Sequence, residues 1–216
     1  MDRRPEPCSQ TTATEPILTT MKKLLPFLAI ALWVSQAQAS IIFFDLTGLA
    51  GFGLRGGNET TALNGTPGSG GETGAGIFYD DVSNLLTINA AWGSANGFTD
   101  LTGPTIAGHL HGPTASGGVA AYNQTAAVKY PLNTLAGWNN SASSGGFNGS
   151  ITILAADEAA LLNGQFYFNA HTTLNSGGEI RGQLIAVPEP SLLALAGLGV
   201  VWALVQWRGR RTRRSA

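Results

Sequence analysis

The chain has 216 residues with 12 basic and 13 acidic side chains, and a formal net charge of −1 excludes an overall basic nucleic-acid-binding protein. Charge is nevertheless segregated: residues 40–187 contain three basic and nine acidic residues, a net charge of −6, and the other basic residues flank them. The same segment holds 26 of the 29 glycines, and since an interior glycine costs a helix about 1 kcal/mol relative to alanine, a helical domain is disfavoured.

The N-terminal region has the three parts of a secretory signal in order. Two lysines precede an apolar run over residues 24–34, and a small-x-small sequence, Ala-Gln-Ala, ends at Ala39. We therefore expect a signal peptide over residues 21–39, cleaved between Ala39 and Ser40, after an upstream extension of residues 1–20. The chain is then exported through the inner membrane.

The middle of the chain, residues 40–187, alternates short runs typical of β-strands with turns rich in Gly, Ser, Asn and Thr. This pattern predicts one all-β domain, an antiparallel β-sandwich of two sheets. The eight predicted strands cover residues 41–47, 75–79, 85–91, 106–111, 126–130, 150–154, 165–171 and 179–185. The glycine-rich residues 58–76 are predicted to be a mobile loop or long connection. A short helix is expected from Glu158 to Leu162, capped by Asp157 and ended by Gly164.

Two motifs that could indicate enzymatic chemistry lack the context it needs. Residues 51–56 satisfy GxGxxG, but the following residues cannot form the helix whose N-terminus would hold a pyrophosphate. The acidic pairs at residues 80–81 and 157–158 are adjacent, and adjacent residues on a strand point to opposite faces. No catalytic residue is therefore assigned, and the protein is not expected to be an enzyme.

The three histidines of the chain are the candidate metal ligands. His109 and His111 are two apart and share a face of their predicted strand, and His171 ends another strand. Together they could bind one metal ion, copper or zinc. The alternative is that these histidines only donate hydrogen bonds to loop carbonyls. Glu179 and Arg181 also share a strand face and are expected to form a structural ion pair or to tie loops together.

The C-terminal residues 188–216 combine three features. They start with Pro188-Glu189-Pro190, continue with the uncharged residues 191–207, and end in a tail with five arginines. Seventeen helical residues span about 25 Å, the lower limit for a membrane helix, and the arginines would hold their end in the cytoplasm.

These C-terminal residues resemble the PEP-CTERM sorting signal of Gram-negative bacteria that make exopolysaccharide. The resemblance implies recognition by an exosortase, cleavage near Pro188 to Pro190 after a transient stay in the inner membrane, and transfer to the cell surface or its matrix. Without processing, the chain would stay anchored in the membrane and face the periplasm.

The middle segment resembles the CHRD domain. The resemblance rests on the blocks HLHGPTASGGVAAY and ILAADEAALLNGQFYFNAHTTLNSGGEIRGQL and covers residues 41–185. It implies a β-sandwich of immunoglobulin-like or superoxide-dismutase-like type in a secreted protein without established enzymatic activity. His109, His111, His171, Glu179 and Arg181 match its motif positions. The His-x-His strand is also similar, weakly, to copper/zinc superoxide dismutases.

The predicted export and sorting signals and the resemblance to the CHRD domain together favour a non-catalytic binding or structural module of the bacterial cell surface or exopolysaccharide matrix. Its expected partners are a processing exosortase and either exopolysaccharide or surface proteins. The alternative is a metal-binding protein or metalloenzyme that uses the three histidines.

Overall fold

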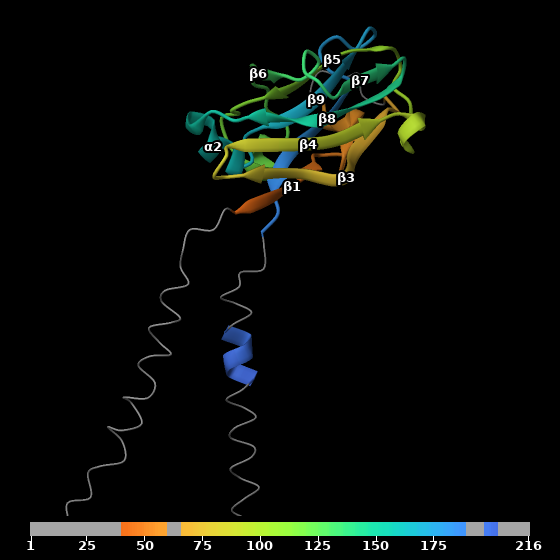
Figure 1. Cartoon of the computed structure of the whole chain (residues 1–216). Helices are drawn as coiled ribbons and strands as arrows, with labels where there is room; N and C mark the ends of the chain where they lie inside the picture. Colours follow the sequence, from red (N-terminus) through yellow and green to blue (C-terminus); the bar gives the residue numbers. More distant parts are fainter. Residues whose placement is uncertain (1–39, 60–65, 189–196, 203–216) are drawn as a thin grey trace, which may run out of the picture. The chain divides into compact units, whose positions relative to one another are not determined.

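The computed structural model describes residues 40–59, 66–188 and 197–202 (Figure 1). Within these ranges the protein is mostly antiparallel β-structure, which confirms the predicted all-β class. The strands are β1 (Ile41–Thr47), β2 (Leu54–Arg55), β3 (Ser69–Asp80), β4 (Leu85–Trp92), β5 (Thr105–His111), β6 (Val128–Pro131), β7 (Trp138–Ser141), β8 (Ser144–Thr152), β9 (Tyr167–Thr172) and β10 (Ile180–Ala186). The helical elements are α2 (Ala155–Leu162) and the 3₁₀ turns η1 (Gly56–Asn58), η2 (Ser94–Asn96) and η3 (Gly118–Ala121).

The ten strands form one continuous sheet, not the two separate sheets that the sequence predicted. Its order is β6-β5-β9-β10-β1-β3-β4-β8-β7, and β2 pairs with both β10 and β3. The sheet folds over on itself, because the Trp92 ring on β4 lies 6.2 Å from the Phe168 ring on β9. Its ends also approach each other, since the Thr105 N–H at the start of β5 donates to the carbonyl of Ala142, after β7. The hydrophobic core lies between the two halves.

Strand β9 shows how the sequence divides between the core and a second, polar face. Phe168 and Ala170 point into the core and are fully buried. Tyr167, Asn169 and His171 alternate with them and therefore lie on the opposite face of the sheet. These three side chains are nonetheless buried, because loops cover this face. The polar face of β9 is the floor of the site described below.

The glycine-rich segment before β4 is the main error of the sequence-based prediction. Residues 69–76 belong to β3, a strand of 12 residues that pairs with β4. Their pairing register shifts between Glu72 and Ile77, and Gly74 and Gly76 there have φ values of +56° and +73°. Glycine is needed at this irregularity because a side chain rarely tolerates positive φ. The glycines therefore mark a distorted strand and not a loop.

The connector helix also starts earlier than predicted. Helix α2 begins at Ala155, and its N-cap residue, Leu154, makes no side-chain capping hydrogen bond. Asp157, the predicted cap, lies inside the first turn, where its carboxylate accepts a hydrogen bond from Tyr130 Oη at 2.6 Å and pairs with Lys129 Nζ at 3.0 Å. The capping prediction was wrong because a partner outside the helix engages this carboxylate.

Both predicted targeting segments fall largely outside the described residues. The extension, the signal peptide up to Ala39 and the Arg-rich tail lie there, as do Glu189 and Pro190 of the sorting motif. Of the predicted membrane helix 191–207, residues 197–202 are described and are helical. Among the described helices, none has the length and apolar character needed to cross a membrane.

A candidate metal centre on the polar face of β9

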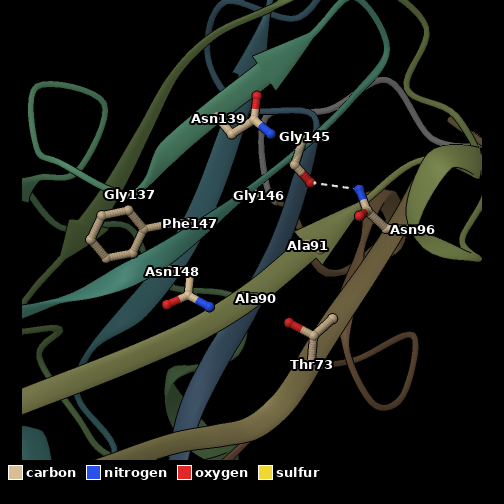
Figure 2. A pocket seen from close by; sticks show the side chains of 10 residues that line it. All are labelled: Thr73, Ala90, Ala91, Asn96, Gly137, Asn139, Gly145, Gly146, Phe147 and Asn148. Carbon is tan, nitrogen blue, oxygen red and sulfur yellow. Dashed lines mark hydrogen bonds between the residues drawn. The ribbon is translucent and has the colours of Figure 1, made fainter.

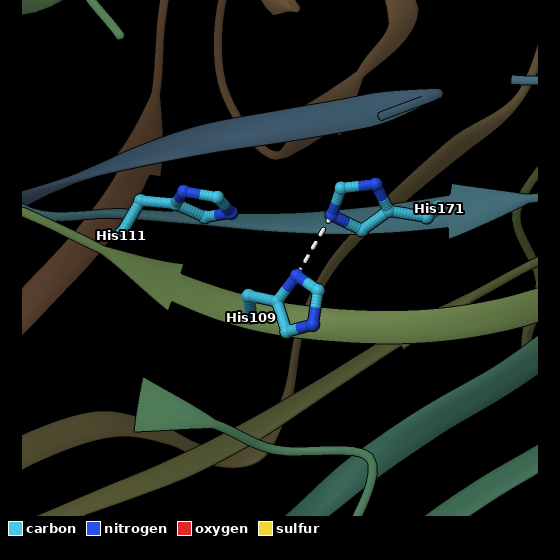
Figure 3. A group of neighbouring side chains, drawn as sticks. All are labelled: His109, His111 and His171. Carbon is cyan, nitrogen blue, oxygen red and sulfur yellow. Dashed lines mark hydrogen bonds between the residues drawn. The ribbon is translucent and has the colours of Figure 1, made fainter. Parts of the chain in front are cut away.

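Pairing of β5 with β9 places the three histidines on one face of the sheet. Ala107 lies opposite His171, His109 opposite Asn169, and His111 opposite Tyr167. Residues two apart on a strand share a face, so His109 and His111 project to the same side as His171 (Figure 3). One nitrogen from each imidazole can be chosen so that all three lie within 4.8 Å of one another. The structure thus brings together the residues that the sequence grouped.

Hydrogen bonds to the backbone set the orientation of two of the rings. His111 Nδ1 lies 2.9 Å from the carbonyl oxygen of Ala126, and His171 Nδ1 lies 2.9 Å from that of Ser176. A carbonyl oxygen can only accept, so each Nδ1 carries the proton, and each Nε2 of the neutral ring has a free lone pair. Both rings therefore present an acceptor nitrogen rather than an N–H to their neighbours.

His109 completes the cluster from its more exposed side. Its Nδ1 lies 2.9 Å from His171 Nε2, and since that atom is an acceptor, His109 Nδ1 donates (Figure 3). His111 Nε2, by contrast, is buried and has no hydrogen-bond partner. Of the two backbone-anchored rings, His171 thus has a satisfied lone pair and His111 an unsatisfied one.

Burial favours the neutral form of the His109 and His111 imidazoles. Burial, with a smaller contribution from repulsion between charged His109 and the nearby His171 and His111 rings, lowers the pKa of His109 to about 4. Burial likewise lowers the pKa of His111, against the opposing effect of its bond to the Ala126 carbonyl. Neutral imidazole is the form that binds metal ions, so the site is ready for a cation near neutral pH.

A stack of side chains supports the cluster from the side of β10. The Tyr167 ring stacks on the His111 ring with 4.8 Å between centroids and 4° between planes. The Arg181 guanidinium carbon lies 3.5 Å from the centre of the same Tyr167 ring. Because β5 and β10 pair with opposite edges of β9, His111 and Arg181 flank Tyr167 on either side. This row of three side chains holds the His111 ring in place on the polar face.

Glu179 and Arg181 act separately. The fully buried Glu179 carboxylate accepts hydrogen bonds from the Thr102 N–H at 2.7 Å, and from Thr102 Oγ1, Thr172 Oγ1 and Asn175 Nδ2 at 2.8, 2.6 and 3.1 Å. Arg181 Nη2 donates to the Ala121 carbonyl and to Gln183 Oε1. The described residues show no ion pair between them, so the loop-tying alternative describes both residues.

Two residues of this face were not assigned a role from the sequence. Asn169 lies between Tyr167 and His171 on β9 and is 2% exposed, and its Nδ2 donates to Glu59 Oε2 at 3.1 Å. The alternation of β9 could have pointed to Asn169. Glu59 precedes it by 110 residues, and no local pattern predicts that contact.

The GxGxxG motif and the acidic pair at residues 80–81 lie in short secondary-structure elements and turns. Residues 54–58 of the GxGxxG-containing segment form β2 and the 3₁₀ turn η1. Asp80 accepts hydrogen bonds from the Val82 and Ser83 N–H groups in the turn after β3. A separate open hollow of about 200 Å³ lies over β4 and β8 and is lined by several amide side chains, among them Asn96, whose Nδ2 donates to the Gly145 carbonyl (Figure 2). The three histidines are not part of it.

Comparison with known protein families gives two matches. The model of the CHRD domain matches residues 52–184, and the model of the PEP-CTERM protein-sorting motif matches residues 186–211. The second motif is a sorting signal recognised by exosortase, and it implies export and processing at the cell envelope. Neither the curated proteins nor the solved structures that were searched contain a match to this chain.

Proposed function

Since the chain belongs to the CHRD-domain family, and its sorting motif directs it to the cell envelope, we propose that it is a non-catalytic metal-binding module of the cell surface. His109, His111 and His171 are its ligands, and copper or zinc is its ion. The observation that carries this proposal is the convergence of three imidazole nitrogens within 4.8 Å.

The donor atoms follow from the hydrogen bonds. His111 and His171 would bind through Nε2, because each holds its Nδ1 proton against a backbone carbonyl. Metal-binding histidines typically anchor their second nitrogen in this way. His109 would bind through Nδ1, the atom that faces His171 Nε2. The ion then replaces the proton between these two rings, and His109 takes up its Nε2–H tautomer on the exposed side of the cluster.

The spacing suits a first-row ion with modest adjustment. Nitrogens bound to zinc at about 2.0–2.1 Å lie about 3.4 Å apart in a tetrahedron. The pair of His109 and His171 nitrogens, at 2.9 Å, would open slightly, and the widest separation of 4.8 Å would close. Imidazole ligands favour zinc and copper over magnesium and calcium, which prefer oxygen ligands.

Equilibrium dialysis of the purified protein against Zn²⁺ or Cu²⁺, followed by elemental analysis, tests this proposal. We expect about one equivalent of metal per chain and its loss in the H109A/H111A/H171A variant. The chain contains three histidines in all, so this variant removes every imidazole. Asp45→Asn, which removes an exposed carboxylate on β1, is a matched control for metal bound by surface carboxylates. Equal metal content in wild type and triple variant would refute the proposal.

The surface role is supported by the sorting motif and tested separately. We propose that the processed protein resides at the cell surface or in the exopolysaccharide matrix, where it binds polysaccharide or other surface proteins. Cell fractionation and co-sedimentation with purified exopolysaccharide measure both. A protein that stays in the inner membrane and sediments with no matrix component would contradict this part, whatever its metal content.

A further inference from the structure

Asn169 occupies the centre of the polar face on which the histidines lie. Along β9 it lies between Tyr167 and His171, and across the sheet it lies opposite His109 on β5 and Arg181 on β10. Its side chain is 2% exposed. Both polar atoms of a buried amide normally have hydrogen-bond partners.

Only the amide nitrogen of Asn169 has a partner. Nδ2 donates to Glu59 Oε2 at 3.1 Å, whereas Oδ1 is buried without any hydrogen bond. The amide is not free to exchange these positions, because its oxygen would then face a carboxylate oxygen and both atoms are acceptors. Glu59 therefore fixes which way the amide points.

The contacts of the amide nitrogen place it on the side of β10, and we infer from them that the oxygen faces the histidines. A Cβ at Gly178, just before β10, would collide with Glu59 Oε2 and lie 2.9 Å from Asn169 Nδ2, so the pair fills the space that a side chain would take. The other branch of the amide faces away from Gly178, and the Asn169 side chain is close enough to His111 to affect its pKa, although burial has the larger, opposite effect.

Two buried acceptors on neighbouring side chains thus lack a donor. His111 Nε2 has a lone pair because its proton is on Nδ1, and Asn169 Oδ1 has two. Leaving a buried acceptor unsatisfied destabilises the folded state, because the group has lost its hydrogen bonds to water. A hydrogen-bond donor could satisfy each one separately, but a single cation beside His109 and His171 would satisfy both.

We propose that Asn169 supplies the oxygen ligand of the metal site, with Glu59 as its positioning residue. This inference rests on the proposed function. The ion then has three neutral imidazole nitrogens and one neutral amide oxygen as ligands. The carboxylate of Glu59, which is hydrogen-bonded to Asn169, compensates the charge of the ion without binding it. A set rich in imidazole with no thiolate favours Zn²⁺ and Cu²⁺ over Cu⁺, and a set without a carboxylate disfavours Ca²⁺.

The test is a competition titration of the full-length protein with Zn²⁺ against a chelating indicator. We expect Asn169→Leu to keep one site per chain but raise Kd about 10- to 100-fold. Asn148→Leu, an exposed asparagine on β8, is the matched control and should leave Kd unchanged. Glu59→Ala should raise Kd by a smaller factor, and Glu59→Gln should recover only part of this loss, because it keeps an acceptor for Asn169 Nδ2 but lacks the charge.

Electron paramagnetic resonance of the Cu²⁺-loaded protein separates a ligand from a structural role. Asn169→Asp, made together with Glu59→Gln so that no two carboxylates face each other, keeps the shape but places a charged oxygen at the ion. The copper hyperfine splitting should therefore change, and Zn²⁺ should bind more tightly. This variant also decides the matter if Asn169→Leu fails to fold. Wild-type Kd and an unchanged spectrum in this double variant would overturn this inference while metal loss in His171→Ala upheld the proposed function. Absence of binding to the wild type would overturn both.

Discussion

Two polar clusters, one on β5 and β9 around the histidines and one around Glu179 just before β10, differ in how completely their hydrogen-bonding groups are satisfied. Around Glu179, one carboxylate accepts hydrogen bonds from four donors, which belong to Thr102, Thr172 and Asn175. Around the histidines, His111 Nε2 and Asn169 Oδ1 are buried with no partner. The Glu179 cluster is complete within the protein and ties loops together. The histidine cluster carries unused acceptors, which is the state expected of a site that takes up a cation.

Removing the Glu179 carboxylate should have the largest effect on the stability of the protein. Glu179→Ala removes the acceptor of four donors, and hydrogen bonds to a charged group contribute about 1.5–3 kcal/mol each, though not additively. We expect the free energy of unfolding to fall by about 3–5 kcal/mol, measured by urea denaturation. Zn²⁺ stoichiometry of the folded fraction should not change. A loss below about 1 kcal/mol would show that this cluster is not a structural clamp.

Added metal should stabilise the protein through the histidine cluster, whereas the Glu179 cluster should contribute nothing to this gain. Zn²⁺ at 100 times its Kd should stabilise the wild type by about 2.7 kcal/mol, because the ion binds the folded chain only. His171→Ala should lose this gain, which is measured against the variant's own metal-free stability because the buried ring also packs against His109 and His111. Thermal unfolding with added Zn²⁺ or with a chelator measures both. Equal stabilisation of wild type and variant would contradict the contrast between the clusters.

The two clusters were predictable from the sequence to different degrees. Period-two alternation along β9 and the His-x-His spacing on β5 identify which residues share a face, so His109, His111 and His171 could be grouped from the sequence alone. Loop partners could not be found this way. Glu59 reaches Asn169 across 110 residues, and Thr102 reaches Glu179 across 77, through packing that no local period encodes.

The fold shows the same division. Strands with clear alternation, such as β1 and β4, were predicted almost to the residue. Strand β3 was partly missed because its glycines serve a register shift, and β7 was missed because only four residues pair at the sheet's end. The sequence shows where glycine gives the backbone conformational freedom, but not whether that glycine lies in a loop or in a distorted strand.

The smallest effect, and the sharpest test of the difference between the clusters, is the pH dependence of the metal-free protein. The folded-state pKa of His109 is lowered to about 4, chiefly by burial, against 6.5 for an ordinary histidine, and burial lowers the pKa of His111 as well. The unfolded chain therefore binds protons at a higher pH than the folded one, so stability should be full above pH 6.5 and fall progressively as the pH drops toward 4. Thermal denaturation in the presence of a chelator should show this slope in wild type and a much weaker one in H109Q/H111Q. Glu179→Ala, although far less stable, should keep the wild-type slope across this window, because it leaves the imidazoles in place. Identical slopes in wild type and the double glutamine variant would mean that these imidazoles do not titrate as a buried, neutral cluster.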